Sequence, residues 1–176
     1  MKTITKVLLP ILALFSAMLM AQPNDISPES IKKVGADKVF YLVRHTEKLE
    51  GDNPGLTAQG QLRAVRLAKV LSSTLLSKVY TTDYKRTRET ALAVAQAQHA
   101  EPNIYDPRDL KAVATTLLNE QGHILVVGHS NTTTELVEML GGDKQPPIDD
   151  NNEFDRLYIV TVDGNNRMVS TVLLRY

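Results

Sequence analysis

The chain has 176 residues, no cysteine, and 20 basic against 20 acidic side chains. This balance gives no overall basic field, which argues against a nucleic-acid partner. Without cysteine no disulfide can form, so the fold must depend on its hydrophobic core.

Residues 1–21 have the layout of a secretory signal peptide, because lysines precede an apolar run over residues 7–20. The run is shorter than the roughly 20 residues of a membrane-spanning helix, and Pro10 interrupts it. We therefore expect cleavage near Ala21 and an exported protein, periplasmic or secreted, without stable membrane insertion after cleavage. An uncleaved N-terminal membrane anchor is the alternative.

Residues 22–37 contain Pro23, Pro28 and Gly35 and few apolar side chains, which predicts an exposed leader. Residues 38–176 have the length of one domain and are too few for two ordinary ones. We therefore expect a single domain over residues 38–176.

From residue 38 onward, short β-branched or aromatic runs alternate with longer segments of helical period. This alternation is typical of a three-layer α/β domain with a mostly parallel central sheet and helices on both faces. The expected strands, of which the third is weak, are residues 39–43, 78–81, 103–105, 124–127, 157–162 and 168–174. The expected helices are residues 58–71, 87–98, 109–119 and 132–140. Thr57 is placed to cap the first helix, and the turn-forming residues 163–166 predict a C-terminal β-hairpin.

Side chains suited to binding an anion follow three of the expected strands. Arg44 and His45 follow the first strand, Arg86 comes a few residues after the second, and His129 follows the fourth. Ligands of open α/β sheets bind outside the carboxyl ends of the strands, so we expect these side chains to meet. Two arginine forks with histidines beside them suit the oxygens of a phosphoryl group. The sequence has no Gly-rich nucleotide-binding loop, which disfavours nucleotide triphosphatases and dinucleotide enzymes.

These residues lie in four segments that resemble the histidine phosphatase superfamily, in the branch of phosphoglycerate mutases and small phosphohistidine phosphatases. The segments are LVRHTEK, GLTAQGQLRA, TTDYKRTRETA and VVGHSN, and they occur in the order of the family. The resemblance runs from about Lys38 to the C-terminus and implies a phosphoglycerate mutase-like fold.

The resemblance also implies a reaction, the hydrolysis of phosphomonoesters through a covalent phosphohistidine on His45. In it, Arg44, Arg86 and His129 bind the phosphoryl group. The partners would be a small phosphorylated substrate and inorganic phosphate, with no metal and no other cofactor. Thr46 stands where the family has glycine, and we expect it to narrow the space beside the nucleophile.

The proton donor for the leaving group is not supplied by the four segments. Larger members of this branch carry a glutamate in a long segment after the second arginine, and residues 91–121 are compact and lack it. Glu47 is the first candidate for this catalytic role, and Asp106 is the second. An ion pair is the alternative role for Glu47. The short segment also predicts an open pocket.

Other functions fit parts of the same sequence. A phosphohistidine protein phosphatase and a non-catalytic phosphate-binding domain would both keep the arginines. A serine hydrolase using Ser130 would need a histidine later in the chain, and none follows His129. A metal site on the two histidines and Glu47 is disfavoured, because the neighbouring arginines would repel a cation. The sequence does not indicate the oligomeric state.

Overall fold

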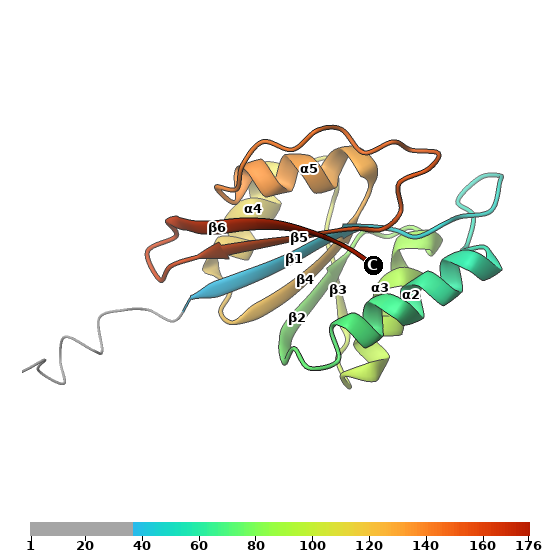
Figure 1. The fold of residues 1–176 in the computed structure, drawn as a ribbon, viewed down its shortest axis with the longest axis horizontal. Coiled ribbons are helices and arrows are strands. Elements are labelled where there is room, and N and C mark those ends of the chain that lie inside the picture. The colour runs from blue at the N-terminus through green and yellow to red at the C-terminus, as the bar shows by residue number, and fades with distance from the viewer. Residues whose placement is uncertain (1–36) are drawn as a thin grey trace, which may run out of the picture. The chain divides into compact units, whose positions relative to one another are not determined.

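The structure, a computed structural model, describes residues 37–176, which form a six-stranded sheet with helices on both sides (Figure 1). The predictions for the signal peptide and for the leader up to residue 36 lie outside the described residues. The strands are β1 (Lys38–Arg44), β2 (Leu76–Thr81), β3 (Pro102–Ile104), β4 (His123–Gly128), β5 (Arg156–Val162) and β6 (Met168–Arg175). The helices are α2 (Ala58–Val70), α3 (Lys85–Ala97), α4 (Leu110–Asn119) and α5 (Ser130–Met139).

The strand order is β3-β2-β4-β1-β5-β6, with β1 and β4 at the centre. The pairs β1–β4, β2–β4 and β2–β3 are parallel, while β5 is antiparallel to both β1 and β6. The central strands β1 and β4 are almost continuously buried, as expected for parallel strands that are covered on both faces. The edge strand β3 is short and begins at a proline, which an edge position tolerates. The expected α/β fold with its C-terminal β5–β6 hairpin is confirmed.

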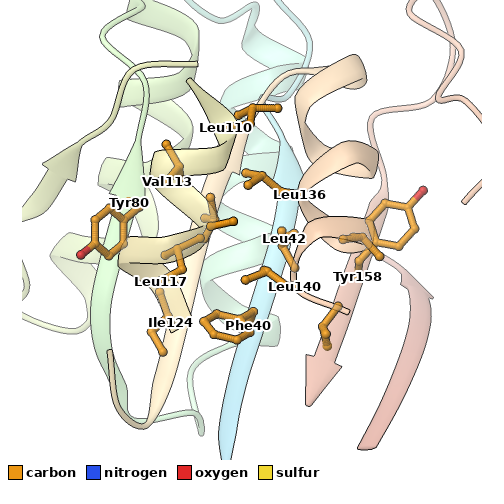
Figure 2. Packing of buried hydrophobic residues seen from close by; sticks show 14 of the residues in the cluster. Phe40, Leu42, Tyr80, Leu110, Val113, Leu117, Ile124, Leu136, Leu140 and Tyr158 are labelled. Carbon is orange, nitrogen blue, oxygen red and sulfur yellow. The ribbon is translucent and has the colours of Figure 1, made fainter. Parts of the chain in front are cut away.

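The two faces of the sheet carry separate hydrophobic clusters. Phe40 and Leu42 of β1 belong to the cluster under α4 and α5, which Figure 2 shows. Tyr41 and Val43 point the other way and belong to the cluster under α2 and α3. Because successive side chains of a strand point to opposite faces, one apolar run in β1 contributes to both layers. This accounts for the three-layer architecture.

Two helices begin two residues earlier than the sequence pattern predicts. The helix α3 begins at Lys85 instead of residue 87, and α5 begins at Ser130 instead of residue 132. The first turns of both helices are polar, and the apolar residues that indicate a helix begin one turn later. The sequence therefore does not predict these first turns. As a result, Arg86 and Ser130 lie in first helical turns instead of loops.

The carboxyl ends of the central strands meet at one edge of the sheet. Arg44, at the end of β1, is in register with Gly128, at the end of β4. Because β5 runs the opposite way, the residues just before Arg156 reach the same edge. This arrangement concentrates the polar residues of several segments in one place. No helix within residues 37–176 is long and apolar enough to cross a membrane.

The central position of Leu42 predicts a large loss of stability when its side chain is truncated. Leu42 is fully buried in β1, whereas Leu62 on α2 is 72% exposed. We expect Leu42→Ala to lower the free energy of unfolding by about 2–5 kcal/mol, through lost burial and a cavity. The matched change Leu62→Ala should stay within about 0.5 kcal/mol. Urea unfolding of both variants measures this, and similar losses would contradict the assigned core.

Candidate active site

A pocket of about 770 Å³ opens at the carboxyl edge of the sheet. Its walls include Arg44, His45, Arg86 and His129, the four side chains that the sequence predicts to meet. The imidazole rings of His45 and His129 lie edge to face, with 5.7 Å between their centroids and an angle of 71° between their planes. One small ligand can therefore contact both histidines.

His45 is held in a single orientation by two hydrogen bonds. Its backbone N donates to the carbonyl oxygen of Gly128 at 2.9 Å, which ties the end of β1 to the end of β4. Its Nδ1 lies 2.8 Å from the carbonyl oxygen of Thr46. A carbonyl oxygen can only accept, so Nδ1 carries the proton and Nε2 keeps its lone pair. The ring thus presents a nucleophilic nitrogen.

Both histidines are kept neutral by their surroundings. The pKa of His45 is lowered to about 3, first by burial and then by the positive charges of Arg44 and Arg86. The pKa of His129 is lowered to about 4 by burial and then by the same two arginines. The hydrogen bond from His45 to Thr46 acts in the opposite direction but is outweighed. Neither ring is therefore protonated at neutral pH.

His129 caps the start of α5 and is packed on two sides. The backbone N of His129 donates to Thr132 Oγ1 at 2.9 Å, which explains why the helix begins directly after it. Its Nε2 lies 3.1 Å from Thr82 Oγ1. The ring of Tyr84 stands perpendicular to it, at a centroid distance of 5.1 Å. The polar contact and the aromatic wall fix the imidazole beside His45.

Arg44 is almost fully buried and bound by the segment that precedes β5. Its Nη1 donates to the carbonyl oxygens of Asp149, Asp150 and Glu153 at 3.0, 3.3 and 3.1 Å. Its Nη2 contacts Asp150 Oδ1 at 3.0 Å. The guanidinium also lies over the ring of Phe154, 4.2 Å from its centroid. These contacts hold the cation in one place at the base of the pocket.

Arg86 also lines the pocket and lies over an aromatic ring. Its guanidinium lies 4.6 Å from the centroid of the Tyr84 ring. The Nε atoms of Arg86 and Arg44 are both buried, and neither has a hydrogen-bond partner among the described residues. An unpaired buried donor is costly, and both of these donors belong to side chains that line the pocket.

The expectation that Thr46 narrows the space beside the nucleophile is wrong. Thr46 is fully buried, and its Oγ1 donates to the carbonyl oxygen of Gly60 at 2.8 Å, away from the pocket walls. Its backbone N donates to Thr90 Oγ1 at 3.1 Å. A Cβ at Gly60 would lie 2.1 Å from the carbonyl oxygen of Glu47, so only glycine permits this approach. Thr46 therefore joins the loop after β1 to α2 and α3.

Glu47 lines the pocket, but its carboxylate is occupied by Arg63. Arg63 Nε and Nη2 lie 2.9 and 2.7 Å from Glu47 Oε1. Burial alone would raise the pKa of Glu47, but the hydrogen bonds from Arg63 outweigh it and the pKa is lowered. An anchored, ionised carboxylate is poorly suited to donate a proton, so this contact argues against the donor role and for the ion pair.

Asp106 lies outside the pocket walls, although the adjacent Pro107 and Arg108 belong to them. Its exposed carboxylate is bound by Arg108, whose Nε and Nη2 lie 2.9 and 2.7 Å away. The hydrogen bonds from Arg108 lower the pKa of Asp106 to about 2. This position and this charge state argue against Asp106 as the donor.

The pocket residues that were not anticipated from the sequence include Tyr84, Phe154 and Asp150. Tyr84 lies in the segment TTDYKRTRETA, two residues before Arg86. This short distance could have indicated that Tyr84 lies near the pocket. Phe154 and Asp150 belong to a turn-rich stretch before β5, and no signal in the sequence links them to the pocket. They reach it because β5 is antiparallel to β1.

The remaining expectations concern the rim, the serine and a metal. The exposed side chains of Lys48, Glu50 and Arg108 belong to the pocket walls, so the predicted open pocket is observed. Ser130 also lines the pocket, but no hydrogen bond joins it to a histidine in the described part of the chain. Within residues 37–176, no cluster of three or more His, Cys, Asp or Glu side chains could hold a metal ion.

The chain is similar to known proteins in one segment of sequence and over most of its fold. The model of the histidine phosphatase superfamily (branch 1) matches residues 40–111. A comparison with curated protein sequences gave no match.

Among solved structures, the protein histidine phosphatase SixA complexed with tungstate has a TM-score of 0.65 at 16% identity, covering 78% of this chain and 96% of SixA. A mycobacterial glucosyl-3-phosphoglycerate phosphatase has a TM-score of 0.60 at 10% identity, covering 80% and 98%. A phosphoglycerate mutase from Plasmodium falciparum has a TM-score of 0.54 at 19% identity, covering 81% and 91%.

At such low identities the structural likeness establishes the fold alone, whereas the matched segment contains four of the predicted site residues, Arg44, His45, Glu47 and Arg86. The matched family and the phosphatases among the structural neighbours support a phosphatase enzyme. Residues 40–111 are thus similar to the histidine phosphatase superfamily (branch 1), and the fold of the described residues is similar to that of the three solved structures.

Proposed function

We propose that the protein hydrolyses phosphomonoesters through a covalent phosphohistidine on His45. The observation that carries the proposal is the state of this side chain: a neutral imidazole whose Nδ1 is bound to Thr46, beside two arginines with unpaired Nε donors. A protonated histidine could not attack phosphorus, and a freely rotating one would lose its orientation.

In the first step, the lone pair of His45 Nε2 attacks phosphorus in line with the leaving oxygen. A bond from nitrogen to phosphorus forms as the bond from phosphorus to the leaving oxygen breaks. Water then attacks the phosphohistidine, releasing inorganic phosphate and neutral His45. The hydrogen bond to Thr46 supports both steps, because it stabilises the positive charge that develops on the ring.

Arg44, Arg86 and His129 would hold the oxygens of the transferring group. Both arginines line the pocket, each has a buried Nε–H without a partner among the described residues, and a planar fork can bind a phosphoryl group through two N–H donors. His129 stands 5.7 Å from His45, centroid to centroid, a distance that permits contact with the same phosphoryl group. Because these donors are already oriented, little reorganisation is needed as charge develops on the oxygens.

A phosphohistidine protein phosphatase is the second candidate. It is favoured by the structural likeness to the protein histidine phosphatase SixA and by the ion pairs that occupy Glu47 and Asp106. A phosphorylated imidazole is a better leaving group than an alkoxide, so its cleavage depends less on an acid. The exposed rim of the pocket would admit either a protein side chain or a small ester.

We also propose that the mature protein acts outside the cytoplasm, since its N-terminal residues resemble a signal peptide. An extracytoplasmic phosphate ester is then the better substrate, because phosphorelay proteins reside in the cytoplasm. Mutase activity is disfavoured, since isomerisation requires the intermediate to be retained and reoriented in a covered site.

The first prediction concerns the nucleophile. We expect His45→Ala to lower the rate of p-nitrophenyl phosphate hydrolysis by at least roughly 10³-fold and to abolish an acid-labile phosphoenzyme. His99→Ala is the matched control, because His99 is exposed and lies outside the pocket walls, and it should keep the wild-type rate. Equal rates for His45→Ala and wild type would rule out this site. An inactive wild type that still binds phosphate would indicate a binding domain.

The neutral state of His45 also predicts how stability depends on pH. The pKa of His45 is lowered from 6.5 to about 3 in the folded protein. At neutral pH neither the folded nor the unfolded state is protonated, so the shift has no effect there. Below about pH 6.5 the unfolded chain takes up a proton that the folded protein does not, so stability falls as the pH falls. This loss continues until the pH reaches the folded pKa.

Between pH 6.5 and pH 5 this histidine should lower the free energy of unfolding by roughly 2 kcal/mol. Urea unfolding in phosphate-free buffer measures it, and His45→Asn should lose correspondingly less stability over the same range. If both proteins lose the same amount, the folded pKa of His45 is not depressed.

Export predicts a specific mature terminus. Full-length chain expressed in a bacterial host should be recovered from the periplasm or the medium with its N-terminus near Gln22. Intact-mass measurement of the purified protein determines the terminus. Recovery of the uncleaved chain in the membrane fraction would support the anchor instead, and recovery in the cytosol would contradict both.

A further inference from the structure

Asp150 is the acidic side chain in contact with the proposed phosphate site. It lies in the connection between α5 and β5, drawn in orange in Figure 1, which passes along the carboxyl edge of the sheet. Its Oδ1 is 3.0 Å from Arg44 Nη2, and its side chain is 72% exposed. The pocket walls include it together with its neighbours Asn151 and Phe154.

Asp150 differs from the other carboxylates of the pocket walls, Glu47 and Glu50, in what it contacts. Arg63 makes three short contacts with the Glu47 carboxylate, and we expect substrate binding to leave these contacts in place. Glu50 lies at the exposed rim. The Asp150 carboxylate contacts Arg44 itself, through a single short contact, so a bound phosphoryl group would compete with it directly.

The geometry of Arg44 shows which contact a substrate would replace. Nη1 is occupied by three backbone carbonyl oxygens, and Nε is buried and has no partner in the part of the chain that the structure describes. A phosphoryl group that binds side-on needs Nε and the Nη on the same edge of the guanidinium. Since Nη1 is fully used, that second donor is Nη2, which now contacts Asp150. One phosphoryl oxygen therefore takes the place of the Asp150 carboxylate.

The displaced carboxylate has to remain close to the bound phosphoryl group. The backbone carbonyls of Asp149, Asp150 and Glu153 stay bound to Arg44 Nη1, so the chain on both sides of the side chain is anchored. Asp150 then faces a dianion without its cation. Two anionic groups held this close share a proton, because one of them is stabilised by protonation. A protonated carboxyl group in this place would stand next to the reacting phosphorus.

We propose that Asp150 is the proton donor to the leaving group, an inference that rests on the phosphatase reaction proposed above for His45. As His45 Nε2 bonds to phosphorus, the bond to the leaving oxygen breaks, and the Asp150 carboxyl passes its proton to that oxygen. The product is an alcohol and a carboxylate. In the second step the carboxylate takes a proton from the attacking water, whose oxygen bonds to phosphorus as the nitrogen–phosphorus bond breaks. Neutral His45 and protonated Asp150 are restored.

The test compares two leaving groups in the same protein. Nitrophenolate leaves without a proton, whereas an alkoxide requires one. We expect Asp150→Asn to lower kcat for glycerol phosphate by about 10²–10⁴-fold, and kcat for p-nitrophenyl phosphate by less than about 10-fold. Because the second substrate is still turned over, the same measurement shows that the variant is folded.

Two controls separate this proposal from its alternatives. Glu50→Gln removes a pocket carboxylate that has no contact with Arg44, and it should change both rates by the same factor. His45→Ala should be inactive toward both substrates; if it is active, the proposed reaction itself fails, whatever Asp150 does.

Three outcomes would overturn the role of Asp150 alone. The first is an equal loss on both substrates in Asp150→Asn. The second is a lower KM with unchanged kcat on both substrates, which would mean that Asp150 only competes with substrate for Arg44. The third is a wild-type protein that hydrolyses p-nitrophenyl phosphate but no alkyl phosphate.

Discussion

The hydrogen bond from His45 Nδ1 to the carbonyl oxygen of Thr46 is the contact on which the chemistry of the pocket depends. It determines which ring nitrogen carries the proton, and so which one is free to attack. The carbonyl is itself fixed, because the Thr46 side chain is bound to Gly60 and its backbone N to Thr90. A threonine where the resembled family has glycine thus contributes to the support of His45, the proposed nucleophile, instead of obstructing it.

Charge is distributed around this bond so that the histidines stay neutral and the arginines stay available. Most acidic side chains near the sheet edge are paired with arginines outside the proposed phosphate site, as Glu47 is with Arg63 and Glu153 with Arg156 and Arg175. These pairs stabilise loops without using the donors that face the pocket. The pair between Asp150 and Arg44 is different, because Arg44 belongs to the proposed phosphate site. For this reason we propose a catalytic role for Asp150.

The unpaired Nε donors of Arg44 and Arg86 cost free energy of folding, and a bound anion would offset part of this cost. Within residues 37–176 two buried guanidinium Nε groups lack acceptors, and both arginines lie over aromatic rings that restrict their movement. Such a site is prepared for an anion before the anion arrives, so little binding energy is spent on ordering side chains. Tyr84 and Phe154 therefore belong to the site although neither has a group that reacts.

The sequence by itself determined the alternation of strands and helices. The spacing of apolar residues along a short segment depends on which of its faces is buried, and this spacing differs between strands and helices. It also indicated that Arg44, His45, Arg86 and His129 would gather, since each follows a strand of one parallel sheet. It could not show that Glu47 is bound to Arg63, or that Phe154 and Asp150 enter the pocket. Those contacts depend on the antiparallel direction of β5 and on side-chain packing between distant segments, which only the tertiary structure decides.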